Sequence, residues 1–427
     1  FHLAATVPRL PQTKMYTKVS ETASPEQCAA EKYCEPNCFH WSQRTQGFLC
    51  CVVVVLLVGG AFVAYQVAEN IFGPVADGAS NVLIQDGVSY TATGSIGIVI
   101  TNLTARRLHV SPAGYGYPQL AILKPPAPST RIDDLSIAGE YLFGLDGNCG
   151  GLGPLCTKDG YLSVYKLGSN PPKLVSGPVS VPIGPYSGVS AAAGHVVVSG
   201  GNKVLTVYNY DQQTGHLGAS FTNDLARSQP DVLIHPDGAI AFVQTWFPDG
   251  TPERDIGNGR GVTVIALKDG AAPTTVARIA CCPEATLTPG LGSRWSNFPL
   301  ACALYRNAPP LEVLVCVDVA GLHFTNVTHA ASLTLHAKGV HLGDLPLDGG
   351  GSHVAVFRNR AFVVGGKTAP ILTELDISGL ASGGLVGRVI HSCSLPKDSR
   401  PVGVAANQNI VAVASLGRDS MFFPTSE

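Results

Sequence analysis

A unit of two short apolar runs joined by a Gly- or Asp-rich turn recurs along the chain from about residue 85 onward. Many copies continue into a polar excursion before the next unit begins. Five copies are clear, and they open at Leu135, Val189, Val232, Val354 and Val402. They recur at roughly 45–60 residues, which is the scale of a four-stranded propeller blade. The repeat therefore predicts an all-β fold built from blades around an axis.

Two weaker copies bring the predicted number of blades to seven. One contains residues 94–100, and the other spans residues 285–335 with Leu311–Val319 as its clearest strand. Insertions in the fifth copy leave six or eight blades as alternatives, whereas a linear solenoid would need a strict period of about 20–30 residues. The last copy is short, so we expect strands from residues 83–100 to pair with it and close the ring.

The copy at Val232–Val243 contains the sequence H-P-D-G and is followed by a second apolar strand at Val262–Ala266. This copy resembles the YVTN repeat of lactonase-like β-propellers, in which H-P-D-G precedes an apolar strand and a V-x-V-I-D strand. The stretch Leu135–Tyr165 is similar to the LVIVD type of repeat. The resemblance implies a propeller fold at the level of the repeat. It carries no catalytic residues to this chain, because no catalytic set matches residue by residue.

Composition agrees with a folded, turn-rich, all-β chain. Charged residues make up only 14% of the sequence, while Gly and Pro number 48 and 31. Such a chain is too apolar for disorder and rich in turn residues. The formal net charge of −2 provides no basic field, which argues against nucleic acid as a partner.

Phe48–Ala68 is a continuous apolar segment, and no charged residue lies between Arg44 and Glu69. About twenty residues at 1.5 Å each match the ~30 Å hydrocarbon core of a bilayer. A soluble helix of this length would need a polar face. The segment therefore predicts one transmembrane helix. The predicted organisation is a flexible cytosolic tail at residues 1–47, the helix at 48–68, a linker at 69–84 and the propeller ectodomain at 85–427.

Flanking charges predict the orientation of this helix. The basic residues before it are Arg9, Lys14, Lys18, Lys32 and Arg44, and the first charges after it are Glu69, Asp77 and Asp86. The positive-inside rule then places the N-terminus in the cytosol and the propeller outside the cell or in a lumen. We expect a single-pass type II signal-anchor protein of the plasma membrane or secretory pathway. A signal peptide is the alternative, but its apolar region usually has ~7–15 residues and lies nearer the N-terminus.

Cysteines beyond the apolar segment predict disulfide bonds, because an oxidising compartment favours pairing. Cys149 and Cys156 bracket a Gly-rich loop, and Cys302 and Cys316 flank a turn between two apolar runs. We expect one bridge within each pair. Seven cysteines follow the segment, and an odd number leaves one thiol free or intermolecular.

Other positions are candidates for modification. Cys50 and Cys51 lie at the cytosolic end of the apolar segment, where S-palmitoylation is common, although cysteine is also simply a small apolar residue in lipid. Asn102 and Asn326 each begin an N-x-T glycosylation sequon, on the side that the charges place in the lumen. Chance occurrence of so short a motif is the alternative.

Metal binding has two candidate regions and no compact motif. One is a set of histidines with two nearby carboxylates: His323, His329, His336, His341 and His353, with Asp344 and Asp348. Neutral imidazole is a common metal ligand, but no H-E-x-x-H or similar spacing is present. The other is the acidic, Gly-rich segment Asp255–Gly261, which offers oxygen ligands to Ca²⁺ or is a plain turn. The sequence assigns no cofactor.

Two long excursions are expected to form the binding face. Residues 246–260 and 286–298 carry exposed-type aromatic and arginine residues, which dominate recognition surfaces. The candidate ligand-binding residues are Trp246, Arg254, Asp255, Arg260, Arg294 and Trp295. We expect both excursions to open on the same mouth of the propeller.

The predicted function is a binding or adhesion module for an extracellular protein or glycan. The alternative is a lactonase-like hydrolase with a metal at the central channel, since propellers serve both classes. The chain has no G-x-S-x-G nucleophile elbow, and whether it is an enzyme stays open at this point.

Overall fold

The computed structural model describes most of the chain from residue 78 onward. The described ranges are 78–105, 109–111, 114–147, 159–183, 187–200, 204–225, 228–246, 260–280, 301–308, 311–318, 320–329, 340–366, 369–382, 387–416 and 418–426. The chain divides into two compact units, residues 1–71 and 72–427. The predicted tail and membrane span lie outside the described residues. Within those residues, no helix has the length and apolar character needed to cross a bilayer.

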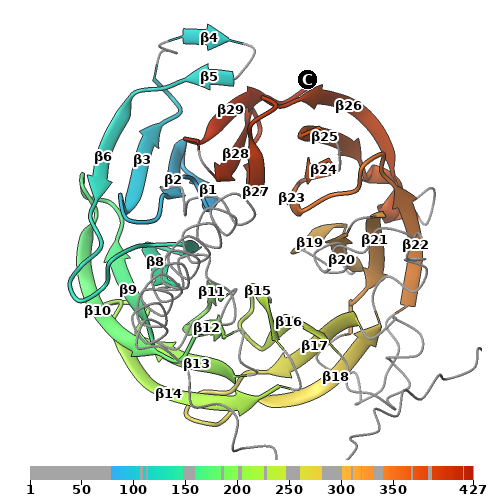
Figure 1. Ribbon diagram of the computed structural model, residues 1–427. Helices are drawn as coiled ribbons and strands as arrows, with labels where there is room; N and C mark the ends of the chain where they lie inside the picture. Colours follow the sequence, from blue (N-terminus) through green and yellow to red (C-terminus); the bar gives the residue numbers. More distant parts are fainter. Residues whose placement is uncertain are drawn as a thin grey trace, which may run out of the picture. The chain divides into compact units, whose positions relative to one another are not determined.

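Seven sheets follow one another around a central axis (Figure 1), six with four strands and one with three in the described part of the chain. Blade 1 contains β1 (Asn81–Gln85), β2 (Val88–Ala92), β3 (Ile98–Asn102) and β6 (Gln119–Leu123), and blade 2 contains β7 (Asp134–Ala138), β8 (Tyr141–Asp146), β9 (Gly160–Lys166) and β10 (Lys173–Val181). Blade 3 contains β11 (Gly188–Ala192), β12 (His195–Ser199), β13 (Val204–Tyr210) and β14 (Leu217–Asp224), and blade 4 contains β15 (Ser228–Ile234), β16 (Ile240–Trp246), β17 (Arg260–Ala266) and β18 (Thr274–Ala280).

Blade 5 contains β19 (Ala301–Ala308), β20 (Leu311–Val317), β21 (Gly321–Asn326) and β22 (Val340–Pro346), and blade 6 contains β23 (His353–Phe357), β24 (Arg360–Gly365), β25 (Ile371–Asp376) and β26 (Arg388–Ser394). Blade 7 contains β27 (Arg400–Ala406), β28 (Ile410–Leu416) and β29 (Met421–Pro424). A short hairpin, β4 (His109–Ser111) with β5 (Gly114–Gly116), leaves blade 1 between β3 and β6, and a 3₁₀ turn, η4 (Ser378–Ser382), follows β25. The predicted seven-bladed, all-β propeller is confirmed, and the first strand begins at Asn81, inside the stretch expected to be linker.

All strand pairs within the blades are antiparallel, so the ends of the strands gather on two faces of the ring. The turns from the first to the second strand lie on one face, which we call the inner-hairpin face. The connections from the second to the third strand, and from one blade to the next, lie on the other, which we call the loop face. Residues on the innermost strands therefore line a channel between the two faces.

The core lies between neighbouring blades, and the middle strands contribute to two interfaces at once. On β12, Val196 and Val198 pack in a cluster with blade 2, whereas Val197 packs with blade 4. All three are fully buried. A strand covered on both faces must be apolar at successive positions, which explains why the sequence shows continuous apolar runs rather than strict alternation.

The ring closes differently from the sequence-based expectation. Strands within residues 83–100 were expected to complete the last blade, but they form blade 1 with β6. The two-residue turn Asp86–Gly87, with φ of 50° and 74°, folds β1 directly onto β2, so these residues are already paired. Blade 7 instead meets the β4–β5 hairpin, because the backbone of Gly114 on β5 approaches β29 so closely that a Cβ there would lie 2.7 Å from the Phe422 carbonyl oxygen.

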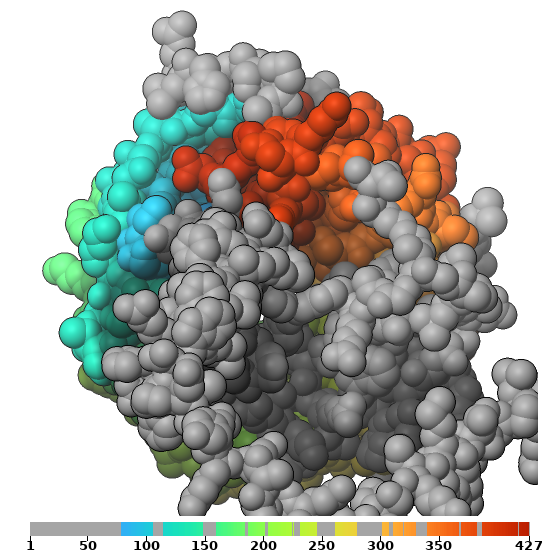
Figure 2. All heavy atoms as spheres, viewed as in Figure 1, coloured from blue at the N-terminus to red at the C-terminus, as the bar shows by residue number. Residues whose placement is uncertain are grey.

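The joint between blades 7 and 1 also contains a hydrophobic cluster, in which residues such as Val82 and Tyr117 pack with Phe422. Figure 2 shows the atoms of blade 1, blue and cyan, beside those of blade 7, red. The Ala79 amide donates to the Arg418 carbonyl at 3.0 Å, and the hydroxyls of Thr91 and Ser420 are 2.9 Å apart. This joint is the seam of the ring.

Candidate functional site

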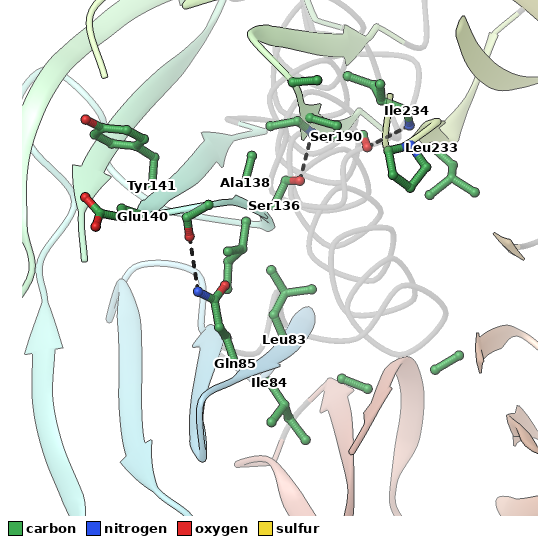
Figure 3. A pocket seen from close by; sticks show the side chains of 18 of the residues that line it. Leu83, Ile84, Gln85, Ser136, Ala138, Glu140, Tyr141, Ser190, Leu233 and Ile234 are labelled. Atoms are coloured by element: carbon green, nitrogen blue, oxygen red, sulfur yellow. Dashed lines mark hydrogen bonds between the residues drawn. The ribbon is translucent and has the colours of Figure 1, made fainter. Parts of the chain in front are cut away.

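A pocket of about 660 Å³ opens along the axis toward the inner-hairpin face (Figure 3). Its wall comes from the innermost strands of blades 1, 2, 3, 4, 6 and 7, and from the turns that follow β7, β11 and β13. The volume falls within the range of ligand-binding sites. We call this feature the axial pocket.

Its lining presents polar and apolar atoms in similar proportion. The wall residues include Leu83, Ile84, Leu233 and Ile234, whose side chains pack between neighbouring blades, and a series of alanines on β7, β11, β23 and β27. The described lining contains one charged side chain, Glu140, which is 75% exposed at the rim and lies 3.7 Å from the Lys166 ammonium. The pocket therefore favours uncharged groups and has a weakly acidic rim.

Side chains on one side of the axis bind the backbone of the next blade, and we call these residues the ladder. The Ser136 hydroxyl accepts the Ala191 N–H at 2.9 Å, and the Ser190 hydroxyl accepts the Ile234 N–H at 3.0 Å. Nearer the loop face, Asp134 accepts the Val189 N–H at 2.7 Å, and Asp231 accepts the Cys302 N–H at 2.7 Å. The ladder thus joins blades 2 to 3, 3 to 4 and 4 to 5 through the innermost strands. Backbone N–H groups of β11, β15 and β19 are therefore engaged in these hydrogen bonds.

Both ladder carboxylates titrate far from their ordinary range. Burial raises the pKa of Asp134 to about 7, despite hydrogen bonds from Val189, Asn81 and Leu135. Burial also raises the pKa of Asp231 to about 6, against hydrogen bonds from Cys302 and Val232. The negative charge of Asp231 adds to the shift at Asp134, which couples the two groups.

The strands opposite the ladder differ in their backbone donors, although Gln85 on β1 and Ser352 before β23 donate to carbonyl groups of the next blade. In the described part of the chain, no backbone N–H of β1, β23 or β27 donates to a side chain of a neighbouring blade. The pocket residues of these three strands are Leu83, Ile84, Gln85, Ala355, Val356, Val404, Ala405 and Ala406. We call this side of the pocket the open arc.

Backbone strain gathers at the rim. Asp86, Ala193 and Arg358 are the non-glycine residues with positive φ in the described ranges, at 50°, 44° and 54°, and each begins the turn between the first two strands of its blade. Such conformations cost of order 1 kcal/mol in a non-glycine residue. The Gln85 amide donates to the Gly139 carbonyl at 3.1 Å across blades 1 and 2 (Figure 3). The rim is therefore built from tight turns rather than long loops.

The H-P-D-G turn connects two blades. His235 has Nδ1 2.6 Å from an Asp237 carboxylate oxygen and Nε2 3.0 Å from a carboxylate oxygen of Glu312 on β20. The Arg306 guanidinium lies 2.8 Å from the same Glu312 oxygen. With both imidazole nitrogens engaged, His235 joins blade 4 to blade 5, and the repeat motif has a structural role here.

The six residues predicted to bind ligand lie largely outside the described residues. Arg254, Asp255, Arg294 and Trp295 fall in residues 247–259 and 281–300. The backbones of Trp246 and Arg260 pair at the ends of β16 and β17, and nothing describes their side chains. The strand ends beside both excursions lie at the loop face. Residues 247–259 connect the second strand of blade 4 to its third, and residues 281–300 connect blade 4 to blade 5. At these ends Gly261 pairs with Ala280, and Cys302 of blade 5 contacts Asp231 of blade 4.

Two of the predicted metal-region histidines lie beside carboxylates. His323 lies 3.0 Å from Asp318 and 2.6 Å from Asp344, and His341 lies 3.2 Å from Asp344. Burial lowers the pKa of His353, on β23, to about 4. The described residues contain no group of three or more His, Cys, Asp or Glu side chains arranged to hold a metal ion. His336 and most of the Asp255–Gly261 segment lie outside them.

One predicted disulfide is present. Cys302 and Cys316 are bonded, and they face each other in the register of β19 and β20. Cys149, Cys156, Cys50 and Cys51 lie outside the described residues. Cys393 on β26 is a free thiol.

The two sequons form the same turn after the third strand of their blades. The Asn102 carboxamide oxygen accepts the amide of Thr104 at 2.9 Å, and that of Asn326 accepts the amide of Thr328 at 3.0 Å. Asp376 does the same for Ser378 in blade 6. The Asx-x-Ser/Thr pattern is therefore also a turn signal of this repeat, independent of any glycan.

Sequence reasoning missed the axial pocket. Its residues are mostly small or aliphatic and come from six blades, so no local sequence motif predicts the pocket. A usable signal was the alanine content of the first strands, as in Ser190–Ala192 and Val404–Ala406, because small side chains near an axis leave space.

The fold and the site together define a seven-bladed β-propeller whose axial pocket has, in its described lining, one charged side chain, at the rim. Solved structures resemble it at low identity. A chain in the crystal structure of the Mitotic Checkpoint Complex has a TM-score of 0.50 at 12% identity, with 82% of this chain and 91% of that chain covered. Raptor from Chaetomium thermophilum has a TM-score of 0.51 at 11% identity, with 82% of this chain and 28% of that chain covered. These similarities support the fold alone.

A scan with protein-family models finds no match for the chain, and a search of curated proteins finds none either. The likeness to lactonase-like repeats therefore stays at the level of the repeat.

Proposed function

We propose that this propeller is a binding module for a protein partner and that the partner inserts an apolar segment into the axial pocket. The observation that carries this proposal is the pocket itself, about 660 Å³ with small and aliphatic residues in its wall and, among the described lining, one charged side chain at its rim. Propellers commonly act as platforms for protein partners, and the two similar structures described above include one solved as a multiprotein complex.

A hydrolase is less well supported by the same lining. The described pocket residues include Ser136 and Ser190 but no histidine, lysine, cysteine or aspartate. A serine nucleophile needs an adjacent base, and each of these hydroxyls is instead bonded to a backbone amide of the next blade. The proposal is therefore binding rather than catalysis.

A glycan is also less well supported than a protein. Sugar recognition commonly uses exposed aromatic faces with polar side chains around them. Tyr141 and Tyr210, the aromatic residues of the pocket, are 2% and 7% exposed, so they contribute edges to the wall rather than open stacking surfaces.

Anchoring by Phe48–Ala68, with the propeller outside the cell or in a lumen, belongs to the proposal. Its support is the length of that apolar segment and the charges around it. Protease added to intact cells should digest the propeller and spare a tag at the N-terminus. Protection of the propeller in this assay would reverse the proposed orientation.

Site-specific photo-cross-linking tests the binding function. A photoreactive amino acid replaces Gln85 at the pocket rim, and a matched control replaces Val340, which is 62% exposed on the outer strand β22. We expect a protein adduct from position 85 that is absent from position 340 and is lost when Ala355→Phe fills the pocket. Equal adducts at both positions, or an adduct unaffected by Ala355→Phe in a chain with unchanged melting temperature, would show that the pocket is not the binding site.

A further inference from the structure

We infer that the segment bound in the axial pocket is extended and uncharged, and that it pairs through its main chain with the last residues of β27, Val404–Ala406. This inference rests on the proposed function and names the ligand class of the same site. It follows from an asymmetry between the two sides of the pocket.

The ladder side has its channel-facing amides satisfied from within the protein. Val189, Ala191, Ile234 and Cys302 each donate to a side chain of the preceding blade. An incoming strand would find these donors already engaged on β11, β15 and β19. The ladder side is therefore a poor edge for strand addition.

The open arc presents unoccupied strand edges. An innermost strand pairs on one edge only, and alternate N–H and C=O groups point away from its partner. β27 pairs with β28 and has no second hydrogen-bonded neighbour in its sheet. Toward the loop face it is crowded by blade 1, since a Cβ on Gly403 would lie 3.3 Å from the Cα of Asn81. From Val404 onward the strand lines the pocket, so this is where its edge is accessible.

Side chains around that edge are small. Ala405 and Ala406 lie on β27 and Ala355 lies on the neighbouring β23, all in the pocket wall. Small side chains allow another backbone to come within the ~4.8 Å spacing of paired strands. At ~3.3 Å per residue, the three pocket-lining residues of β27, which are partly buried, would pair with a comparably short stretch.

The opposite wall can bind the other edge of the same segment. Ser136 and Ser190 each accept an amide hydrogen, which leaves each hydroxyl hydrogen for a further acceptor. Figure 3 shows both hydroxyls on the pocket wall. Carbonyl oxygens of an extended segment are suitable acceptors, whereas a purely hydrocarbon ligand would leave both donors without one.

Charge sets the remaining preference. The described lining contains one acidic group, Glu140, and no basic one. A segment rich in Asp or Glu is therefore disfavoured, and a basic residue is favoured where the segment leaves the pocket. The effect is modest, because Glu140 is exposed.

The probe is a displayed library of random heptapeptides, selected on the full chain and counter-selected on its Ala355→Phe variant. We expect enriched peptides to be apolar at their centre, poor in acidic residues and often basic at one end. An enrichment of acidic peptides, or no peptide specific to the unfilled pocket, would overturn the inference.

Main-chain pairing has its own test, which needs no protein variant. Each enriched peptide is synthesised in its natural form and with alternate amides N-methylated, a change that removes donors and keeps side chains. N-methylation in the pairing register should weaken binding about fivefold for each main-chain hydrogen bond that is lost. Equal affinity for the two forms would overturn strand pairing, while a pocket-specific adduct in the cross-linking assay would still support the binding function.

Discussion

Replacing Asp134 by Asn should stabilise the propeller at alkaline pH and leave its stability unchanged in acid. Asn has nearly the same shape, and its carboxamide can accept the Val189 N–H while its NH₂ group faces the Asn81 amide, which can turn to accept it. The substitution therefore removes a titrating group and preserves the joint between blades 1, 2 and 3.

The sign follows from the pKa. Burial raises the pKa of Asp134 from 3.8 in the unfolded chain to about 7. Between these values the folded protein holds a proton that the unfolded chain has lost, so the free energy of unfolding falls as pH rises. The stabilising contribution is complete below pH 3.8 and is lost once the pH passes about 7.

The pH-dependent contribution of Asp134 to the free energy of unfolding has an upper limit. About three pH units at roughly 1.4 kcal/mol each give a ceiling near 4 kcal/mol. Asp134 keeps some contact with solvent, so about half of this, ~2 kcal/mol, is the expected gain of the Asn variant at pH 8. For a domain of this size that corresponds to a rise in melting temperature of about 3 °C.

Thermal and urea unfolding at pH 4 and pH 8 measure the effect. Asp376→Asn is a matched control of opposite sign, because hydrogen bonds from Ser378 lower the pKa of Asp376, and removing that carboxylate should destabilise at pH 8. If Asp134→Asn were no more stable than the parent chain at pH 8, or equally more stable at pH 4, the titration of Asp134 would not be the source of the pH dependence.

Three further predictions concern the scaffold. Replacing both Cys302 and Cys316 by Ala removes a disulfide with a sequence separation of 14 and should lower the free energy of unfolding by ~3 kcal/mol. Urea unfolding without reductant, compared with the parent chain, measures this loss, and an unchanged midpoint would contradict it. Ala193→Gly relieves a φ of 44° and should raise the free energy of unfolding by ~0.5–1 kcal/mol, and a loss of stability would show that the alanine methyl matters more than the backbone. Asn326→Ala removes the acceptor of two hydrogen bonds in its turn and should cost ~1 kcal/mol, whereas Asn326→Asp keeps the acceptor and should cost much less. Equal losses in the two variants would show that these hydrogen bonds do not stabilise the propeller.

The repeat was readable from the sequence because each blade places its second and third strands between two neighbours. Positions such as Val196–Val198 are buried from both sides, so the strands are uninterrupted apolar runs ended by turn residues. This signal recurs with every blade, which is why the strands expected at Val262–Ala266 and Leu311–Val319 largely coincide with β17 and β20.

The closure and the pocket could not be read in this way. Both depend on residues far apart in sequence, such as Gly114 with Phe422, or Ser136 with Ala405, whose neighbours are set only when the ring forms. The pairing of Cys302 with Cys316 was accessible because these residues flank one local turn. The long excursions attracted attention through their composition, and the structure leaves their side chains undescribed.

The seam has a consequence for how the chain could be rearranged. Each blade is one continuous stretch, and no strand is shared between the two ends of the ring. A circular permutant that links blade 7 to blade 1 and is cut between blades 3 and 4 should therefore rebuild the same seven sheets. Its new break would fall at a joint where the Ser190 hydroxyl already bonds the next blade. The ring thus has no required starting blade, and the melting temperature of such a permutant would measure how much stability depends on which joint between blades carries the chain break.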